Sequence, residues 1–180
     1  CQAEIRGGHQ FQRHASGRCR LPLQNRSAAF SSLYTWADWE RELGSRFSME
    51  LAARGQIASA PLLSTEDLGL GGNRFLRGYP YSQRSGDEGI MGSGELRYDW
   101  ADALNLVDNI QIYAYADGGY VSNLEDGRGT GELYSAGGGL RPDIVNGLDF
   151  DVELAMPLSG PRYDTDNDNP RLNVKLRKTL

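Results

Sequence analysis

Arg77 has the most distinctive chemical setting in the sequence. It lies within residues 67–88, DLGLGGNRFLRGYPYSQRSGDE, a long polar segment rich in glycine. A guanidinium has five N–H donors and can bind a carboxylate through two parallel hydrogen bonds. Buried beside an acid, Arg77 would fix the segment in one geometry, whereas on an exposed loop it would be an ordinary solvated side chain. The segment alone leaves both interpretations open.

The other polar residues are not spaced as catalytic groups are. Residues 68–74, LGLGGNR, are glycine-rich, but no helical pattern follows them and the GK[ST] ending of a phosphate-binding loop is missing. Asp149 and Asp151 fall on one face of a strand pattern, without other residues that define a pocket. Neither a nucleophile elbow nor an HExxH motif occurs. We therefore expect no enzymatic activity and no cofactor.

Cysteine and histidine residues give no metal-site signal. Cys1 and Cys19 could form a disulfide in an oxidising compartment, or remain two free thiols. His9 and His14 stand apart from other ligand residues and are expected at the surface. Because no Cys/His group has zinc-site spacing, we predict no metal centre.

Composition limits the classes of protein that fit. The 180 residues suffice for one domain, and a net charge of −5 without a basic stripe argues against a nucleic-acid partner. No 18-residue apolar run occurs, so no transmembrane helix is expected; a transmembrane β-barrel stays possible, because its lipid face is confined to alternate residues. The chain begins with Cys1 and has no signal segment, so we expect a mature product or a fragment.

Alternating apolar and polar residues predict long β-strands. In residues 46–58, Phe47, Leu51 and Ile57 fall on one face, whereas Glu50 and Arg54 fall on the other. Thirteen alternating residues are long for a soluble strand and suit a tilted membrane strand. About seven strands are predicted, at residues 30–39, 46–58, 90–100, 109–121, 134–141, 147–156 and 172–177. Residues 1–26 could not be assigned beyond a possible edge strand and loop, and residues 27–180 are expected to form the barrel part.

The connections between these strands alternate in length. Residues 67–88, 122–131 and 159–170 form long polar connections, and the shorter ones lie near residues 40–44, 101–108 and 142–147. Outer-membrane barrels have long extracellular loops and short periplasmic turns, so residues 67–88 are expected outside the cell. Asp149, Asp151 and Glu153 on one strand also complement Lys175 and Arg177 on the next, as facing charges inside a barrel would. A soluble β-sandwich with a solvated charged face remains an alternative.

The run LGGNRFLRGYPYSQRSGDEGIMGSGELRY resembles the sixth extracellular loop and the following strand of the outer-membrane transporters of two-partner secretion, the ShlB/FhaC/HecB family. The LRGY tetrapeptide at residues 76–79 is similar to the wider superfamily's V/L-R-G-Y/F motif. The GD and ELR elements, at residues 86–87 and 95–97, are closer to this subgroup than to the BamA-like branch. YAYADGG, YSAGGGLR and LDFDVELAMPL, at residues 113–119, 134–141 and 148–158, fit the strands that follow.

This resemblance implies an antiparallel, sixteen-stranded transmembrane β-barrel in the bacterial outer membrane, preceded by periplasmic POTRA domains. The present chain would be its C-terminal part, with outer-membrane lipid and the missing N-terminal barrel half as neighbours. The implied function is translocation and activation of a secreted partner protein of the haemolysin or adhesin type, which is unfolded in transit. The chain ends in Leu180, whereas such barrels usually end in an aromatic residue.

The resemblance also implies a loop folded back into the barrel lumen, with Arg77 at its tip. Asp117 is the matching acid on the wall, and strand parity independently places Asp117 on the inward face; Glu95 is a second candidate acid. Leu76 begins this motif, Gly78 would permit a close approach of the loop backbone to the barrel wall, and Tyr79 would pack against that wall. Supporting residues are expected at Gly71, Gly72, Gly86, Asp87, Tyr115 and Gly119.

Three further functions fit the same pattern. A BamA/TamA-like barrel would assemble other outer-membrane proteins, a passive porin or adhesin barrel would have no secreted partner, and a barrel could also be fused to a patatin-like lipase. The sequence upstream of Cys1 would distinguish these, because POTRA-like modules support transport or assembly.

Overall fold

The computed structural model describes residues 2–7, 11–16, 31–104, 107–125, 129–144 and 148–178. All regular elements in this part of the chain are antiparallel β-strands, and no helix in it is long and apolar enough to cross a membrane. The strands are β1 (Gln2–Gly7), β2 (Phe11–Ser16), β3 (Ser32–Glu42), β4 (Phe47–Ala58), β5 (Leu68–Leu70), β6 (Arg84–Gly86), β7 (Glu88–Leu104), β8 (Val107–Ser122), β9 (Gly131–Ile144), β10 (Leu148–Pro157) and β11 (Arg171–Lys178).

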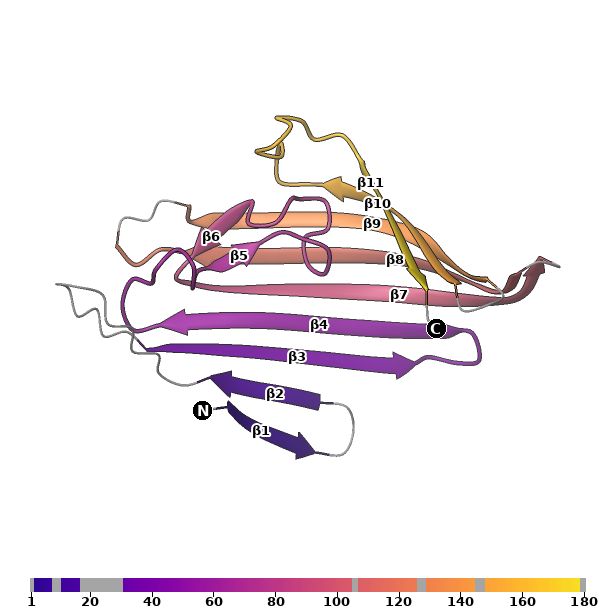
Figure 1. The fold of residues 1–180 in the computed structure, drawn as a ribbon, viewed down its shortest axis with the longest axis horizontal. Coiled ribbons are helices and arrows are strands. Elements are labelled where there is room, and N and C mark those ends of the chain that lie inside the picture. Colours follow the sequence, from indigo (N-terminus) through magenta and orange to yellow (C-terminus); the bar gives the residue numbers. More distant parts are fainter. Residues whose placement is uncertain are drawn as a thin grey trace.

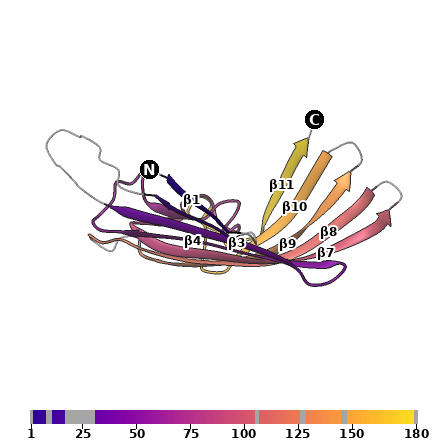
Figure 2. The same ribbon diagram turned by 90° about the horizontal axis from the view of Figure 1, so that it is seen from below.

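Seven of these strands form one sheet in the order β11-β10-β9-β8-β7-β4-β3. Sequence neighbours are spatial neighbours throughout, except that β5 and β6 lie within the connection from β4 to β7. The sheet curls into a trough, which Figure 2 shows from one side. The predicted all-β, antiparallel fold class and the number of main strands are confirmed.

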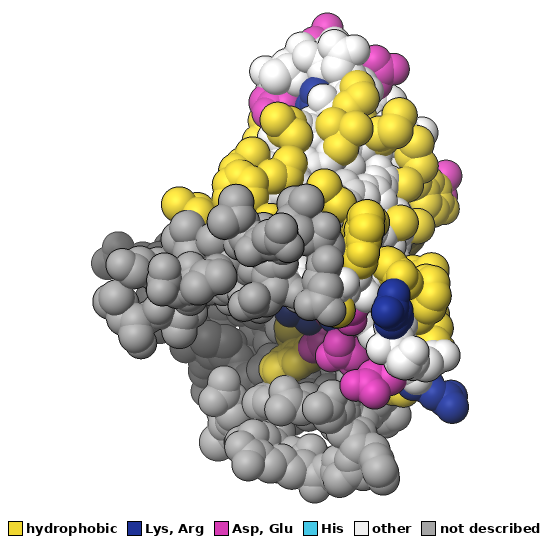
Figure 3. Space-filling model, turned by 90° about the vertical axis from the view of Figure 1, so that its right-hand side faces the viewer, with side chains coloured by type: hydrophobic (Ala, Val, Ile, Leu, Met, Phe, Trp, Pro, Cys, Tyr) yellow, Lys and Arg dark blue, Asp and Glu magenta, His cyan; other side chains and the backbone are white. Residues whose placement is uncertain are grey.

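The two faces of the sheet differ as the alternation predicts. On β4, Leu51 is 44% exposed and the next residue, Ala52, is 8% exposed, because successive side chains point to opposite faces. Register pairs extend this difference across the sheet. One convex row contains Phe47, Tyr98, Ile112, Leu140, Val152 and Val174. Figure 3 shows hydrophobic side chains gathered along this side of the described surface.

Strand ends extend further than predicted. The predicted turn at residues 40–44 begins too early, because β3 continues to Glu42 and the Leu43 amide donates to the Phe47 carbonyl. The predicted linker at residues 101–108 is largely strand, and the predicted turn at residues 142–147 begins only after Ile144. Ladder hydrogen bonds join backbone groups, so pairing continues where polar residues interrupt the side-chain alternation.

Residues 1–26, which the sequence left unassigned, contain the hairpin of β1 and β2. Gln2 pairs with Ser16 and Gly7 pairs with Phe11 in an antiparallel register. The expectations for Cys1, Cys19 and His9, and for the side chain of His14, lie outside what the structure describes.

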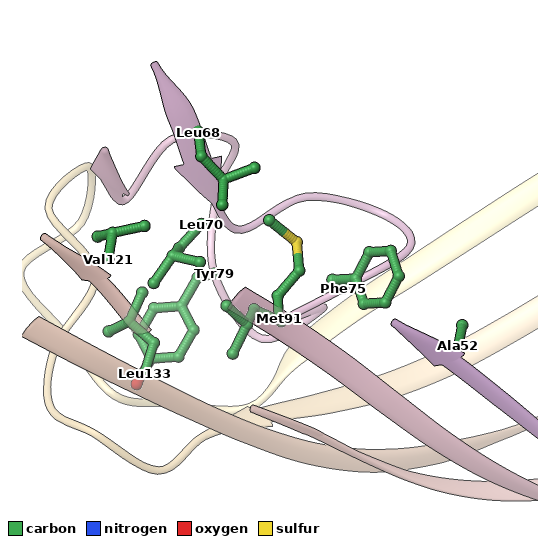
Figure 4. Packing of buried hydrophobic residues seen from close by; sticks show 9 residues of the cluster. Ala52, Leu68, Leu70, Phe75, Tyr79, Met91, Val121 and Leu133 are labelled. Atoms are coloured by element: carbon green, nitrogen blue, oxygen red, sulfur yellow. The ribbon is translucent and has the colours of Figure 1, made fainter. Parts of the chain in front are cut away.

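The connection from β4 to β7, residues 59–87, is called the excursion here. Inside it, β5 and β6 pair into a small hairpin, a feature that the sequence pattern did not predict. Figure 1 shows this hairpin lying over the sheet at β8 and β9. The excursion packs on the concave face through an apolar cluster of Leu68, Leu70, Phe75, Leu76 and Tyr79 against Ala52, Met91, Val121 and Leu133 (Figure 4). The larger apolar cluster of the described residues therefore lies between the excursion and the sheet.

Candidate functional site

The tip of the excursion, residues 76–79, is a tight turn that directs Arg77 at the sheet. The Tyr79 amide donates to the Leu76 carbonyl at 2.9 Å, which closes the turn. Leu76 adopts a φ of +55°, in the left-handed region that costs a non-glycine residue about 1 kcal/mol. Its side chain is fully buried in the apolar cluster, and that burial offsets the cost.

Gly78 lies against the end of β10. A Cβ atom there would be 2.8 Å from the backbone nitrogen of Pro157 and 2.9 Å from the carbonyl carbon of Met156. Both obstacles are backbone atoms, so no side-chain movement could make room. The predicted close approach at Gly78 is therefore present, and it seats the turn on the wall.

Arg77 is 6% exposed, and each of its guanidinium N–H groups has an acceptor within reach. Nε and Nη2 both donate to the carboxylate of Asp117 at 3.2 Å, and the Arg77 backbone amide donates to the same carboxylate at 3.0 Å. Nη1 donates to Glu95 at 2.7 Å and to Glu153 at 3.4 Å, while Nη2 also donates to Ser93 at 3.2 Å. Five donors in a fixed fork therefore meet a matching set of oxygens.

The electrostatic balance of this cluster depends on Arg77. Asp117, Glu95 and Glu153 are all buried, and each contacts the guanidinium. Burial by itself lowers the pKa of Arg77, but the hydrogen bonds and charges of Asp117 and Glu95 outweigh burial and raise it above its ordinary value. The guanidinium is therefore charged at every physiological pH, and without it the acids would be buried without that compensation.

Tyr115 forms the floor under Arg77. The guanidinium carbon lies 3.2 Å from the centre of the Tyr115 ring, a cation–π stack between two buried side chains. Gly137 provides the space for this ring, because a Cβ atom there would be 2.6 Å from the Tyr115 hydroxyl. Arg141 stacks on Tyr113 in the same way at 3.7 Å, next to Gly139. Gly137 and Gly139 of the YSAGGGLR segment thus leave room for the tyrosine rings of the YAYADGG segment.

Asp87 and Gly86 hold the returning end of the excursion. The Asp87 carboxylate accepts the backbone amides of Leu62 at 2.5 Å and Leu124 at 2.8 Å, so it ties the base of the excursion to the loop after β8. A Cβ atom on Gly86 would be 2.7 Å from the Ser122 carbonyl oxygen. Both residues shape the excursion and do not touch Arg77.

The other predicted glycines lie around the tip, at a positive φ or at a close contact. Gly71 has a φ of +113°, and a Cβ atom there would be 2.1 Å from the Pro80 carbonyl oxygen; Gly72 has a φ of +125°. Gly119 faces the apolar cluster, where a Cβ atom would be 2.9 Å from the Leu70 side chain. All the predicted site residues therefore belong to the excursion or to the wall beneath it.

Comparison with known proteins shows the family of this chain. The sequence profile of the haemolysin secretion/activation protein family ShlB/FhaC/HecB matches residues 6–142. The chain belongs to this family. No curated protein sequence matches it significantly.

Two solved structures are similar to this ShlB/FhaC/HecB chain in fold. CdiB from Escherichia coli is 24% identical with a TM-score of 0.66, and the match covers 92% of this chain and 31% of that one. CdiB from Acinetobacter baumannii is 21% identical with a TM-score of 0.64, over 92% and 33%. The chain spans about a third of the length of each CdiB structure.

Glu153 and Ser93 were not predicted as partners of Arg77 in this ShlB/FhaC/HecB chain. Strand parity placed Glu153 inward, but 76 residues separate it from Arg77, and no local pattern reports such a contact. The register supplies the missing information, because Glu153 faces Gly139, which in turn faces Tyr113. Without a side chain at Gly139, Glu153 can reach both Arg77 and Tyr113.

The predicted complementarity between the last two strands is present in part. Asp151 faces Lys175 in the register, and their charged atoms lie 3.6 Å apart. Asp149 faces Arg177, but the side chains of this pair lie outside the described residues. Glu153 has a different role, since it accepts from Asn173 at 3.0 Å as well as from Arg77.

Arg97 and Arg141 extend the cluster along the wall. Both donate to Glu95, at 2.8 Å and 2.7 Å, so that one carboxylate joins three arginines. Within the described part of the chain, no group of His, Cys, Asp and Glu side chains is arranged to hold a metal ion. The chemistry of this site is the binding of a guanidinium by carboxylates.

Proposed function

We propose that this chain is the C-terminal barrel part of an outer-membrane transporter that translocates and activates a secreted partner protein in two-partner secretion. Membership of the ShlB/FhaC/HecB family supports the class of protein. The convex apolar rows suit contact with lipid, and the charged concave face suits a water-filled lumen. We further propose that transport involves no catalytic step and no cofactor.

The barrel needs strands beyond those described. In lipid, each unpaired backbone group of an open sheet edge costs several kcal/mol, so membrane-spanning sheets close on themselves. The seven-stranded sheet ends at β3 and β11, and the chain spans about a third of the CdiB structures. We therefore propose that an N-terminal barrel half supplies the remaining strands and that periplasmic POTRA domains precede it.

The observation that carries the proposal is that Arg77 is buried and that its five guanidinium N–H donors all have acceptors. Removing one partner from a buried charge cluster costs about 3–5 kcal/mol, whereas an exposed ion pair contributes about 0–1 kcal/mol. Arg77 thus acts as a lock that holds the excursion inside the lumen in one geometry. The family match favours secretion over outer-membrane protein assembly or passive diffusion as the purpose of this lock.

The test is Arg77→Ala in the intact transporter, with secretion of the partner protein measured beside insertion of the barrel. Secretion should fall at least tenfold, and heat-modifiable gel mobility should show that the barrel still inserts. Arg74→Ala is the matched control, because Arg74 lies in the same excursion with a half-exposed side chain and pairs with Asp38. Unchanged secretion by Arg77→Ala would refute the proposed mechanism.

A further inference from the structure

The tip of the excursion is held on a second side, by the loop between β10 and β11. Segment 159–163 of that loop is called the clasp here. The Tyr79 hydroxyl accepts the Ser159 amide at 2.7 Å and donates to the Gly160 carbonyl at 3.3 Å. Tyr79 is fully buried, so its hydroxyl depends on these two partners in the clasp.

Gln83 adds a two-way contact with the clasp. Its side-chain amide donates to the Pro161 carbonyl at 3.2 Å, and its side-chain oxygen accepts the Tyr163 amide at 3.0 Å. The NH₂ group and the oxygen of the Gln83 side chain thus both bind the clasp.

Arg162 is the buried centre of the clasp, at 7% exposed. It binds its own loop, donating to Asn167 at 2.5 Å and to the Asn169 carbonyl at 2.8 Å. The same guanidinium reaches across to the Gly78 carbonyl at 3.5 Å. It therefore both shapes the loop and contacts the residue that follows Arg77.

The two sides of the tip are held by different chemistry. The wall binds Arg77 through buried carboxylates, whereas the clasp binds Gly78, Tyr79 and Gln83 mainly through backbone amides and carbonyls. The clasp also leaves the carboxylate cluster untouched, so the two attachments can be removed separately.

We infer that the clasp is a positioning device for Arg77, and that Tyr79, Gln83 and Arg162 keep the tip seated in the carboxylate cluster. This inference rests on the proposed function, since it assigns to loop 158–170 the control of the same lock. In the structure, the tip contacts the clasp and the cluster together, so its departure from the cluster would also break the contacts to the clasp.

Amide hydrogen exchange on the intact transporter in detergent tests this inference. The Arg77 amide donates to Asp117 on the wall in the seated tip, so it exchanges when the tip leaves its seat. Gln83→Ala removes two hydrogen bonds to the clasp and touches neither Arg77 nor the wall. We expect exchange at the tip to rise about tenfold, with exchange in β8 unchanged.

Tyr79→Phe is the second variant, because it removes the hydroxyl and keeps the ring in the apolar cluster. It should raise exchange at the tip to a similar extent, and Asp168→Asn, an exposed change in the same loop, should not. Unchanged exchange at the tip in both clasp variants, or an equal rise in β8, overturns the inference. The proposed function has a separate test, because normal secretion by Arg77→Ala would refute it.

Discussion

Asp117 holds Arg77 at two chemically different points, the backbone amide at 3.0 Å and the guanidinium Nε at 3.2 Å, through the same carboxylate oxygen. Ser135 donates to that oxygen as well, at 3.2 Å. One acid thus fixes both the direction of the backbone at the tip and the plane of the side chain. A residue bound in this way can neither turn nor slide without breaking several bonds at once.

Asp117→Asn should release the tip even though the side chain keeps its shape. The amide has one acceptor oxygen where the carboxylate has two, and its NH₂ group would face donors of Arg77. We expect the seated tip to lose about 3 kcal/mol, since a buried charge loses its main partner. Hydrogen exchange of residues 74–81 measures the loss, and wild-type exchange in this variant would contradict the role of Asp117.

Arg77→Lys should retain only part of the function. The ammonium keeps the positive charge but has three donors and no planar fork, so it cannot serve Asp117, Glu95 and Glu153 together. Secretion is expected to lie between that of the wild type and that of Arg77→Ala. Secretion equal to the wild type would show that charge alone suffices.

The two basic residues should also differ in their response to pH. The raised pKa of Arg77 means that its stabilising contribution is complete below the ordinary arginine pKa and is lost only above the raised one. An ordinary lysine has a pKa of about 10.4, and the same acids would raise it, so the lock in Arg77→Lys should begin to loosen only above about pH 10, while the wild type does not loosen there. Exchange at the tip, corrected for the intrinsic effect of pH, distinguishes the two.

Gly78→Ala should disrupt the site without changing any charge. The added methyl group would meet the backbone of Met156 and Pro157 below 3 Å, which forces the tip away from the wall at a cost of about 1–3 kcal/mol. Gly92→Ala is the control, because its nearest obstacle is an ordinary contact at 3.5 Å. Equal secretion by the two variants would argue against close seating of the tip.

Tyr115→Phe and Tyr113→Phe should differ in their effects on stability. Among the described residues the buried Tyr115 hydroxyl has no hydrogen-bond partner, so its removal should be neutral or stabilise by about 1 kcal/mol while the stack on Arg77 remains. The Tyr113 hydroxyl donates to Asp151 at 2.7 Å and lies 3.2 Å from Glu153, so its loss should destabilise by about 1–3 kcal/mol. Denaturant unfolding of the two variants gives the sign of each change.

Strand faces were predictable because each depends only on neighbouring residues. Leu51 and Ala52 fall on opposite faces by parity alone, and the same parity placed Asp117 inward. The ends of β7 and β9 were not predictable, because Leu104 and Ile144 are in strands through backbone pairing with Val107 and Leu148, and the side-chain pattern does not report backbone pairing.

The site was predictable in part for the same reason. Parity supplied the inward acids, and the family motif supplied the meeting of Arg77 with Asp117 and Glu95. Glu153 enters the site through the register of three strands and the missing side chain of Gly139, which no motif encodes. The β5–β6 hairpin depends on its packing against β8, which the sequence of the excursion does not reveal.

Both ends of the excursion continue into adjacent strands, β4 ending at Ala58 and β7 beginning at Glu88. Arg77 is therefore an intramolecular ligand of its carboxylate cluster. Tethering of this kind gives an effective concentration on the order of millimolar or above, and release does not dilute it. On the proposed function, a polypeptide in transit displaces the tip, and Arg77 can then reoccupy its site without any external ligand, so the lock would reset itself after each passage.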